Sequence, residues 1–337
     1  MESTLYPKIT NRITDVLRDL DRALYPNVSP RIIPLVGTVK LHGTHADIVI
    51  RGDNSIALQS RNRTSLSLEA DNYKFAQFMW VLQPQILNLK QQYHARYTEL
   101  NPGGPAMDPE FPLIIAGEWI GQGIQTGVAI AQLSPRFVIV SAAINGSWLP
   151  DNDYADIHNE ATGIYNISRG GFFHNYLDRN DVEASKEKLQ VLANDIEKKC
   201  PFGESFGIHG VGEGVVWKLR NHSGDPKFWF KVKGPKFSTS SMPKMSKIQD
   251  PTVEGKKAQA REFTEAIVTA RRLEQGLEYL EEMGVNRDQN GMGVFLKWVV
   301  NDCLTEEKRE MQERGIGVKM LSKEINSKAK AWYSKKL

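Results

Sequence analysis

The sequence Val39-Lys40-Leu41-His42-Gly43-Thr44-His45 lies between two runs of residues that predict strands, 32–39 and 46–51. Lys40 follows the first strand and a glycine comes three residues later, so an amine stands at a tight turn where backbone can approach a ligand closely. A surface hairpin with a solvated lysine would carry the same residues. The interpretation of this turn as a reactive site therefore depends on partners supplied by later segments.

Length and composition describe an ordinary globular protein. The 337 residues predict two domains, and the net charge of +3 confines any nucleic-acid contact to local clusters. Cys200 and Cys303 are the only cysteines, which excludes a disulfide framework and a cysteine-rich zinc site. No apolar run approaches about 18 residues, and Met1-Glu2-Ser3 does not begin a basic stretch followed by an apolar one, so we expect neither a membrane span nor a secretory signal. We expect a monomer in a reducing compartment, the cytoplasm or alternatively an organelle, without membrane contact.

The first two thirds of the chain combine predicted strands with a few helices. Strands are expected over 32–39, 46–51, 55–61, 113–120, 137–144, 213–218 and 228–233, and helices over 8–25, 71–97 with a break at Pro84, and 181–199. Gly121-Gln122-Gly123 is not followed by Gly-Lys-Ser/Thr, so a P-loop is not supported. Asp151, Asp153 and Asp156 are spaced loosely like calcium ligands, but the rest of an EF-hand loop is missing and we expect a solvated loop.

Charged residues within the apolar strands are the next signal. Glu118 and Glu213 stand in runs where an unpaired buried carboxylate is costly, so each needs a lysine, an arginine or a metal ion. Lys231 and Lys233 share one face of the last strand, since strand side chains alternate. A solvated edge strand would also explain these two lysines, unless an anion lies between them.

The last third of the chain predicts a separate helical domain. Residues 238–253 are rich in serine, proline and lysine without periodicity, which indicates a linker. Beyond it, apolar spacing predicts helices over 258–283, 293–304 and 318–332. We expect domains at 1–240 and 254–337, joined by a linker at 241–253. The lysine-rich end is either a solvated face or a surface that touches phosphates.

Together these residues suit chemistry on a nucleoside triphosphate. Arg61 and Arg63, at a strand end, are either solvated or offer planar forks to phosphate. Nearby cations would depress the pKa of the Lys40 amine and make it a nucleophile, and they would neutralise the α-phosphate under attack. The two carboxylates would hold a divalent metal ion, most simply Mg²⁺. The predicted product is a lysyl-nucleotide phosphoramidate.

Five segments resemble, in this order, the motifs of covalent nucleotidyltransferases and more narrowly those of the RNA ligase 2 family. They are Lys40-Leu41-His42-Gly43-Thr44, Ser60-Arg61, 117–125, 213–218 and Lys231-Val232-Lys233. The resemblance covers roughly residues 30 to 240. His42 is its most specific residue, because DNA ligases and capping enzymes usually carry an aspartate there. Residues 267–273 resemble the helical C-terminal domain of the family more weakly.

The resemblance implies an α+β fold, in which an adenylation domain of antiparallel sheets around a cleft precedes a small all-helical domain. It implies an ATP-dependent RNA ligase for 3′-hydroxyl and 5′-phosphate RNA ends. In such an enzyme Lys40 takes AMP from ATP, AMP passes to the RNA 5′-phosphate, and the 3′-hydroxyl displaces it.

The same resemblance implies residue roles. Lys40 and His42 would be catalytic, with His42 assisting adenylylation, and Glu213 would hold Mg²⁺ or a lysine. The nucleotide site would comprise Val39, Lys40, Gly43, Arg61, Glu118, Glu213, Lys218, Lys231 and Lys233.

The third motif departs from the family pattern. Where the family commonly has an aromatic residue followed by aspartate, this chain has Val140-Ser141, so an aliphatic side chain would face the base. One alternative is a DNA ligase or guanylyltransferase with the same lysyl-nucleotide chemistry, which His42 argues against. The other is a non-catalytic RNA-binding relic, although every charged position that the chemistry requires is filled.

Overall fold

The computed structural model describes residues 6–25, 27, 29–238 and 252–337. Its chain divides into two compact units, Met1–Pro235 and Lys236–Leu337. Within the expected linker, 241–253, residues 241–251 lie outside the described residues. Its last two positions begin a helix, since the Thr252 side chain caps α6 (Val253–Ile267).

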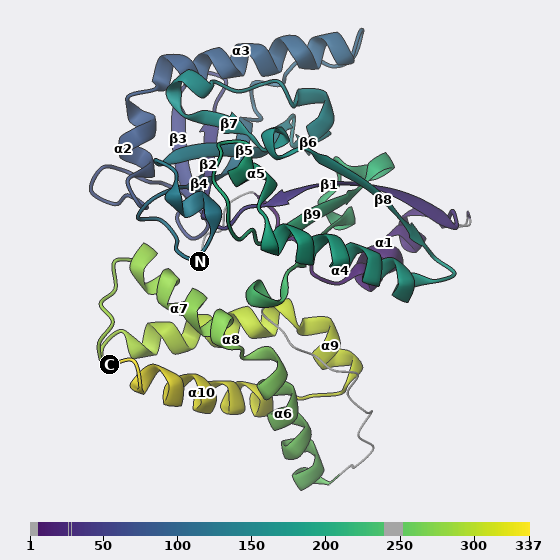
Figure 1. Cartoon of the computed structure of the whole chain (residues 1–337), viewed down its shortest axis with the longest axis vertical. Coiled ribbons are helices and arrows are strands. Elements are labelled where there is room, and N and C mark those ends of the chain that lie inside the picture. The colour runs from purple at the N-terminus through teal and green to yellow at the C-terminus, as the bar shows by residue number, and fades with distance from the viewer. Residues whose placement is uncertain (1–5, 26, 28, 239–251) are drawn as a thin grey trace. The chain divides into compact units, whose positions relative to one another are not determined.

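Two sheets form the framework of the first unit (Figure 1). Sheet A has the strand order β10-β9-β1-β8, and sheet B has the order β3-β2-β4-β5-β6 with β7 beside β5. All pairs are antiparallel except β5 with β7. The strands of sheet A are β1 (Ile32–Lys40), β8 (Phe172–Asp178), β9 (Gly214–Leu219) and β10 (Trp229–Lys233). Those of sheet B are β2 (Thr44–Ile50), β3 (Ile56–Ser60), β4 (Leu113–Ile120), β5 (Arg136–Ile144), β6 (Ser147–Trp148) and β7 (Ile164–Asn166).

Helices cover the outer face of each sheet. Alternate residues of β2 and β4, such as Ile48 and Ile115, are fully buried and share a core with α2 (Phe75–Trp80) and α3 (Gln83–Leu100). Sheet A contacts α4 (Val182–Lys198) through β8, β9 and β10, while α1 (Ile13–Leu24) packs against β10. These layers hold both sheets rigidly at the place where β1 ends and β2 begins.

Most sequence-predicted elements of this unit are confirmed. Pro84 lies in the first turn of α3, where its missing N–H costs nothing, so the predicted break falls just before it. The Asp181 side chain caps α4 by accepting from the Ala184 amide at 3.0 Å. Strand β8 was not predicted, because it is an edge strand of sheet A and only Leu177 in it is fully buried.

The second unit is helical in its described residues. Besides α6 it contains α7 (Ala270–Glu282), α8 (Met292–Glu306), α9 (Lys308–Glu313) and α10 (Val318–Ser334). The prediction of one helix over 258–283 is wrong: the chain leaves helical geometry at Val268, and the Thr269 side chain caps α7 by accepting from the Arg272 amide at 3.3 Å. Apolar spacing continues across the break because both helices bury a face in one core.

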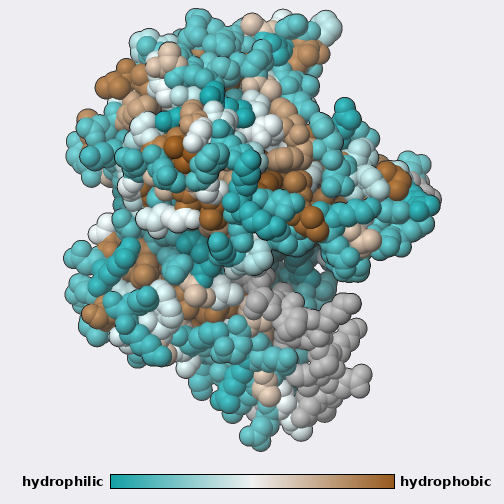
Figure 2. Space-filling view, in the orientation of Figure 1, coloured by the Kyte–Doolittle hydropathy of each residue, from teal (hydrophilic) through white to brown (hydrophobic). Residues whose placement is uncertain are grey.

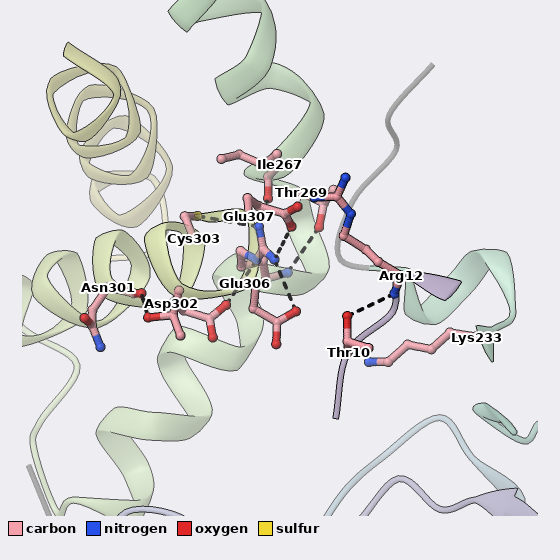
Figure 3. A network of polar contacts seen from close by, with 12 residues as sticks. Thr10, Arg12, Lys233, Ile267, Thr269, Asn301, Asp302, Cys303, Glu306 and Glu307 are labelled. Atoms are coloured by element: carbon pink, nitrogen blue, oxygen red, sulfur yellow. Dashed lines mark hydrogen bonds and ion pairs between the residues drawn. The ribbon is translucent and has the colours of Figure 1, made fainter. Parts of the chain in front are cut away.

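A buried arginine ties α7 to α8. The Arg272 side chain is 0% exposed, and its guanidinium donates to the Ile267 carbonyl at 2.7 Å and to Glu307 at 3.0 Å. Asp302 lies 3.1 Å and Glu306 3.8 Å from the same guanidinium. Figure 3 shows these three acidic side chains gathered beside Ile267 and Cys303.

On the face seen in Figure 2, hydrophobic residues form small separate groups among hydrophilic ones. No helix within the described ranges has both the length and the hydropathy to cross a membrane.

Candidate active site

Lys40 is the last residue of β1, and the register of sheet A brings two partners to it. Lys40 and Lys233 both lie opposite Gly214 of β9, and Glu213 directly precedes this glycine. The Lys40 ammonium group donates to one oxygen of Glu213 at 2.8 Å, while the Lys233 ammonium group lies 2.7 Å from the other. Two cations therefore share one carboxylate, which is only 3% exposed.

Gly214 makes this close approach possible. Its φ of +151° belongs to glycine, and an added Cβ would lie 2.8 Å from the Cα of Lys233 and clash with the Val232 carbonyl group. The backbone of β10 can therefore pass close enough for Lys233 to reach Glu213.

These contacts set the charges of the cluster. Burial would raise the pKa of the Glu213 carboxyl, but Lys233, Lys40 and His42 outweigh it and hold that pKa well below its usual range. Burial would lower the pKa of Lys40, but the carboxylates of Glu213 and Glu118 outweigh it and raise that pKa above its usual value. For the protein's own lysines, the predicted lowering of the Lys40 pKa is therefore wrong, because Glu213 lies between Lys40 and Lys233. The lowering predicted for a metal ion stays a prediction.

The turn after Lys40 is fixed by Glu118 of β4. The Gly43 amide donates to Oε1 of Glu118 at 2.9 Å. A Cβ at Gly43 would come within 2.9 Å of Cγ of Glu118 and clash with the Trp119 carbonyl oxygen, so glycine is required here. Glu118 thus has a defined role in the site, as the acceptor that shapes the turn.

His42 and Val39 flank the nucleophile on different sides. The Nδ1 atom of His42 lies 3.7 Å from Oε2 of Glu213, so His42 lies beside the cluster, and its role in adenylylation stays a prediction. Val39 is 2% exposed and packs toward Gly170, on the opposite face of β1 from Lys40. Its side chain therefore does not join the cluster.

Lys231 and Arg61 are the two remaining cations that the sequence predicted for the site. Lys231 shares its face of β10 with Lys233 and is half-buried. The Arg61 guanidinium donates to the Tyr6 carbonyl at 3.3 Å and lies 5.7 Å from the centre of the Tyr6 ring. Its charge is among those that act on the pKa of Lys40, so it belongs to the same electrostatic environment.

Lys218 has a different environment from the one that the sequence suggested. Its ammonium group lies 2.7 Å from Asp151, donates to the Ser141 hydroxyl at 3.3 Å and sits 3.8 Å from the centre of the Trp229 ring. Burial lowers its pKa against the opposing effect of Asp151. Lys218 lies opposite Val36 of β1, and Val36 is about 13 Å along β1 from Lys40. A direct role for Lys218 in nucleotide binding stays a prediction.

Tyr6 is a residue that sequence reasoning missed. Its ring stacks on His45 at 4.9 Å and meets the edge of Trp148 at 5.2 Å, in a cluster that includes the half-buried Val140. An aromatic ring from the N-terminal segment thus lies beside the position where β5 carries an aliphatic residue. No local sequence signal indicated this contact.

A divalent metal ion would find oxygen ligands here but no complete set of protein groups. Among the residues that the structure describes, no three His, Cys, Asp or Glu side chains converge as a metal site. Mg²⁺ is typically held by one or two carboxylates together with water and substrate phosphates, and Glu213 fits that mode. Both of its oxygens contact lysines, so metal binding would compete with these ion pairs.

Comparison with known proteins adds a family assignment. The model of the RNA ligase family matches residues 33–233, more than half of the chain. Similar solved structures include a Naegleria gruberi RNA ligase mutant with AMP and Mn, at a TM-score of 0.42 and 15% identity over 70% of this chain and 58% of that one. The RNA ligase of that organism with PPi gives a TM-score of 0.43 and 15% identity at the same coverage.

This chain spans less than two thirds of the length of these ligases, and no curated protein matches it. The assignment therefore rests on the family model, whose matched region runs from the second residue of β1 to the last residue of β10. It includes Lys40, Glu118, Glu213 and Lys233. The chain belongs to the RNA ligase family.

Proposed function

We propose that the chain is an ATP-dependent RNA ligase that joins 3′-hydroxyl and 5′-phosphate RNA ends through lysyl-AMP on Lys40 and an RNA-adenylate. The observation that carries the proposal is the sharing of Glu213 by Lys40 and Lys233. Two partly buried ammonium groups on one carboxylate leave positive charge that can bind a nucleotide phosphate.

In the first step the Lys40 amine attacks the α-phosphate of ATP. A phosphorus–nitrogen bond forms, the bond to the bridging oxygen breaks, and pyrophosphate leaves. Lys40 must first lose its proton, which passes to solvent because its side chain is 23% exposed. Because the pKa of Glu213 is held low, this carboxylate orients the amine rather than accepting that proton. Lys233 and Lys231 stabilise the charge that develops on the α-phosphate.

A divalent metal ion bound by Glu213 and the nucleotide would add positive charge that favours the neutral amine and the departing pyrophosphate. A phosphate that arrives at Lys233 competes with Glu213 for its ammonium group. Nucleotide binding is therefore expected to loosen the ion pairs that keep Lys40 protonated.

The later steps transfer AMP to the RNA and then join the two RNA ends. The RNA 5′-phosphate attacks the adenylyl phosphorus, which breaks the bond to Lys40 and forms a phosphoanhydride. The 3′-hydroxyl then attacks the RNA phosphorus, a phosphodiester forms, and AMP leaves. Lys40 is free in this last step, while the other cations still face the reacting phosphates.

The proposal also covers the substrates, the oligomeric state and the compartment of the protein. RNA ends and ATP are the substrates, and the protein acts as a monomer in the reducing cytoplasm. The thiols of Cys200 and Cys303 are both free and buried, which suits that compartment.

The test is to incubate the protein with labelled ATP or GTP and Mg²⁺, and then to add RNA or DNA strands with 3′-hydroxyl and 5′-phosphate ends. Label transferred from ATP, followed by joining of RNA, supports the proposal. Label from GTP alone would indicate a guanylyltransferase, and joining of DNA but not RNA would indicate a DNA ligase. A protein that binds RNA but takes label from neither nucleotide would be a non-catalytic relative.

A further inference from the structure

A second group of cations lies at the start of β5, and none of its residues belongs to the Lys40 cluster. The Arg136 guanidinium lies 4.5 Å from the centre of the Phe206 ring and 5.0 Å from that of Tyr165. The Arg169 guanidinium lies 4.2 Å and 5.6 Å from the same two rings. The rings meet edge to face at 5.0 Å. We call these four residues the arginine–aromatic cluster.

The two arginines of this cluster are not equally neutralised. Arg169 pairs with Glu160 at 2.6 Å. Arg136 donates to the carbonyl group and the hydroxyl of Ser134 at 3.0 and 2.8 Å, and across residues 6–25, 27, 29–238 and 252–337 no carboxylate lies within ion-pair distance of it. Two guanidinium groups thus lie against the same two rings, and only that of Arg169 has a carboxylate partner among the described residues. Such an arrangement favours a further anion.

The cluster is accessible and is attached to the reactive turn. Arg136, Tyr165 and Phe206 are half-buried, and Arg169 is exposed. Arg169 lies in the short helix η4 (Ile167–Gly170), and the next residue, Gly170, packs against Val39, which precedes Lys40. Tyr165 pairs with Val138 in sheet B, and Val138 pairs with Glu118. Both attachments place the cluster on elements that carry the active site.

We propose that the arginine–aromatic cluster binds an unpaired nucleotide of the RNA substrate. Guanidinium forks bind phosphate oxygens through paired hydrogen bonds, and guanidinium planes and aromatic rings stack with unpaired bases. Arg136 and Arg169 take the phosphate, and the base stacks on the exposed surface of the cluster. The inference rests on the proposed function and specifies which part of the RNA this surface holds.

A purely structural role is the competing explanation, and it applies differently to the two arginines. Arg169 donates to the hydroxyl and the carbonyl group of Ser205, at the end of α5 (Pro201–Glu204), so its loss would disturb the packing of that helix. Among the described residues, the hydrogen bonds of the Arg136 side chain stay within its own segment, at Ser134, and its other contacts are with the two rings. Replacing Arg136 therefore removes its charge and its planar guanidinium group, and we expect it to lower the stability of the fold little.

The experiment compares Arg136→Gln with the unmodified full chain and with Arg31→Gln. Arg31 is a matched control, because it is 65% exposed and pairs with Asp178 at the far end of β1 from Lys40. Three quantities are measured: label transfer from ATP, the affinity for a 5′-phosphorylated single-stranded RNA, and the affinity for the same strand in a perfect duplex. Both affinities are taken over a range of salt concentrations.

We expect Arg136→Gln to transfer label normally and to bind the single strand about tenfold more weakly, as for the loss of one stacked contact. The slope of log affinity against log salt should fall by about 0.7, as for the loss of one phosphate contact on a single strand. Duplex affinity and all Arg31→Gln values should not change. Arg136→Lys, which keeps the charge but not the fork or the plane, should restore the salt slope and only part of the affinity.

Unchanged affinity for the single strand in Arg136→Gln would overturn the inference. Equal loss for single strand and duplex would also overturn it, since that result describes a surface for phosphates alone, and full rescue by Arg136→Lys would exclude stacking. Loss of label transfer in Arg136→Gln would assign the cluster to the nucleotide site instead. Failure of the proposed function is distinct from these outcomes, because the unmodified chain itself would then take no label.

Discussion

A buried ion cluster lies in each of the two units, and these two clusters combine similar groups in opposite proportions. In the first unit Lys40 and Lys233 share a single carboxylate, Glu213. In the second unit the single guanidinium of Arg272 contacts three carboxylates (Figure 3). Both central groups are almost fully buried, Glu213 at 3% and Arg272 at 0% exposure.

This difference in proportion separates a reactive cluster from a structural one. A cation surrounded by carboxylates does not attract another anion. Removing that cation leaves buried negative charge without a partner. A carboxylate shared by two cations leaves positive charge for a phosphate. We therefore expect substitutions in the Glu213 cluster to affect activity more than stability, and substitutions in the Arg272 cluster to do the reverse.

The largest effect is expected for Lys40→Ala. This change should abolish the covalent nucleotide adduct, because it removes the attacking amine, and the other amine beside Glu213, that of Lys233, is expected to stabilise the phosphate charge instead. Sealing of RNA supplied already 5′-adenylated should persist, since Lys40 is free in the last step. The measurement is adduct yield and joining of both kinds of RNA, and an unchanged adduct yield would remove Lys40 from the mechanism.

Next in size are Lys233→Ala and Lys231→Ala. Each should lower the rate of adduct formation by about 100- to 1000-fold, as for the loss of one positioned donor to a charge that develops in the transition state. Arginine at either position should not restore the rate fully, because a planar fork does not replace a compact ammonium group. Near-normal rates in both alanine variants would mean that this strand is only a solvated edge.

In the second unit, Arg272→Met should lower the free energy of unfolding of the helical unit by about 3 to 5 kcal/mol, since three carboxylates lose their shared cation. Hydrogen exchange of α7 and α8 measures this loss locally. The control is Arg271→Met, which removes a partly exposed arginine paired with Glu278 at 2.9 Å and should cost less than about 1 kcal/mol. A fall in adduct yield with little change in exchange would contradict the comparison.

The smallest effect concerns the boundary between α6 and α7. Thr269→Ala removes the hydroxyl that accepts from the Arg272 amide and should destabilise the helical unit by about 1 kcal/mol. Thr305→Ala is the matched control, because the Thr305 hydroxyl bonds the Asn301 carbonyl within α8 at 2.7 Å and caps nothing. Equal exchange rates in the two variants would show that the cap contributes no stability.

Sequence reasoning predicted the parts of the site that depend on strand alternation and on local motifs. The position of Lys40 at a strand end, the face shared by Lys231 and Lys233, and the need of Glu213 for a cation all follow from period-2 alternation and from the cost of burying charge. The predicted α+β architecture of antiparallel sheets followed by helices is confirmed. The predicted domain boundaries, 1–240 and 254–337 with a linker at 241–253, stay a prediction.

What sequence reasoning missed depends on contacts between distant segments. Lys218 and Asp151 are 67 residues apart, and Tyr6 reaches His45 from a segment without a motif. The direction of the Lys40 pKa shift depends on which charge lies nearest, and strand patterns do not specify this. Likewise, apolar periodicity cannot reveal a helix break at Thr269 when the helices on both sides face the same core.

The most direct test of the central claim is to locate the adduct. The full-length protein is incubated with ATP and Mg²⁺ and digested, and its peptides are examined by mass spectrometry. The account predicts one adenylyl group per chain, on the peptide that contains Lys40, with the modified residue assigned to Lys40 by fragmentation. An adenylyl group on any other residue, or a peptide that stays unmodified under conditions in which the protein joins RNA, would contradict it.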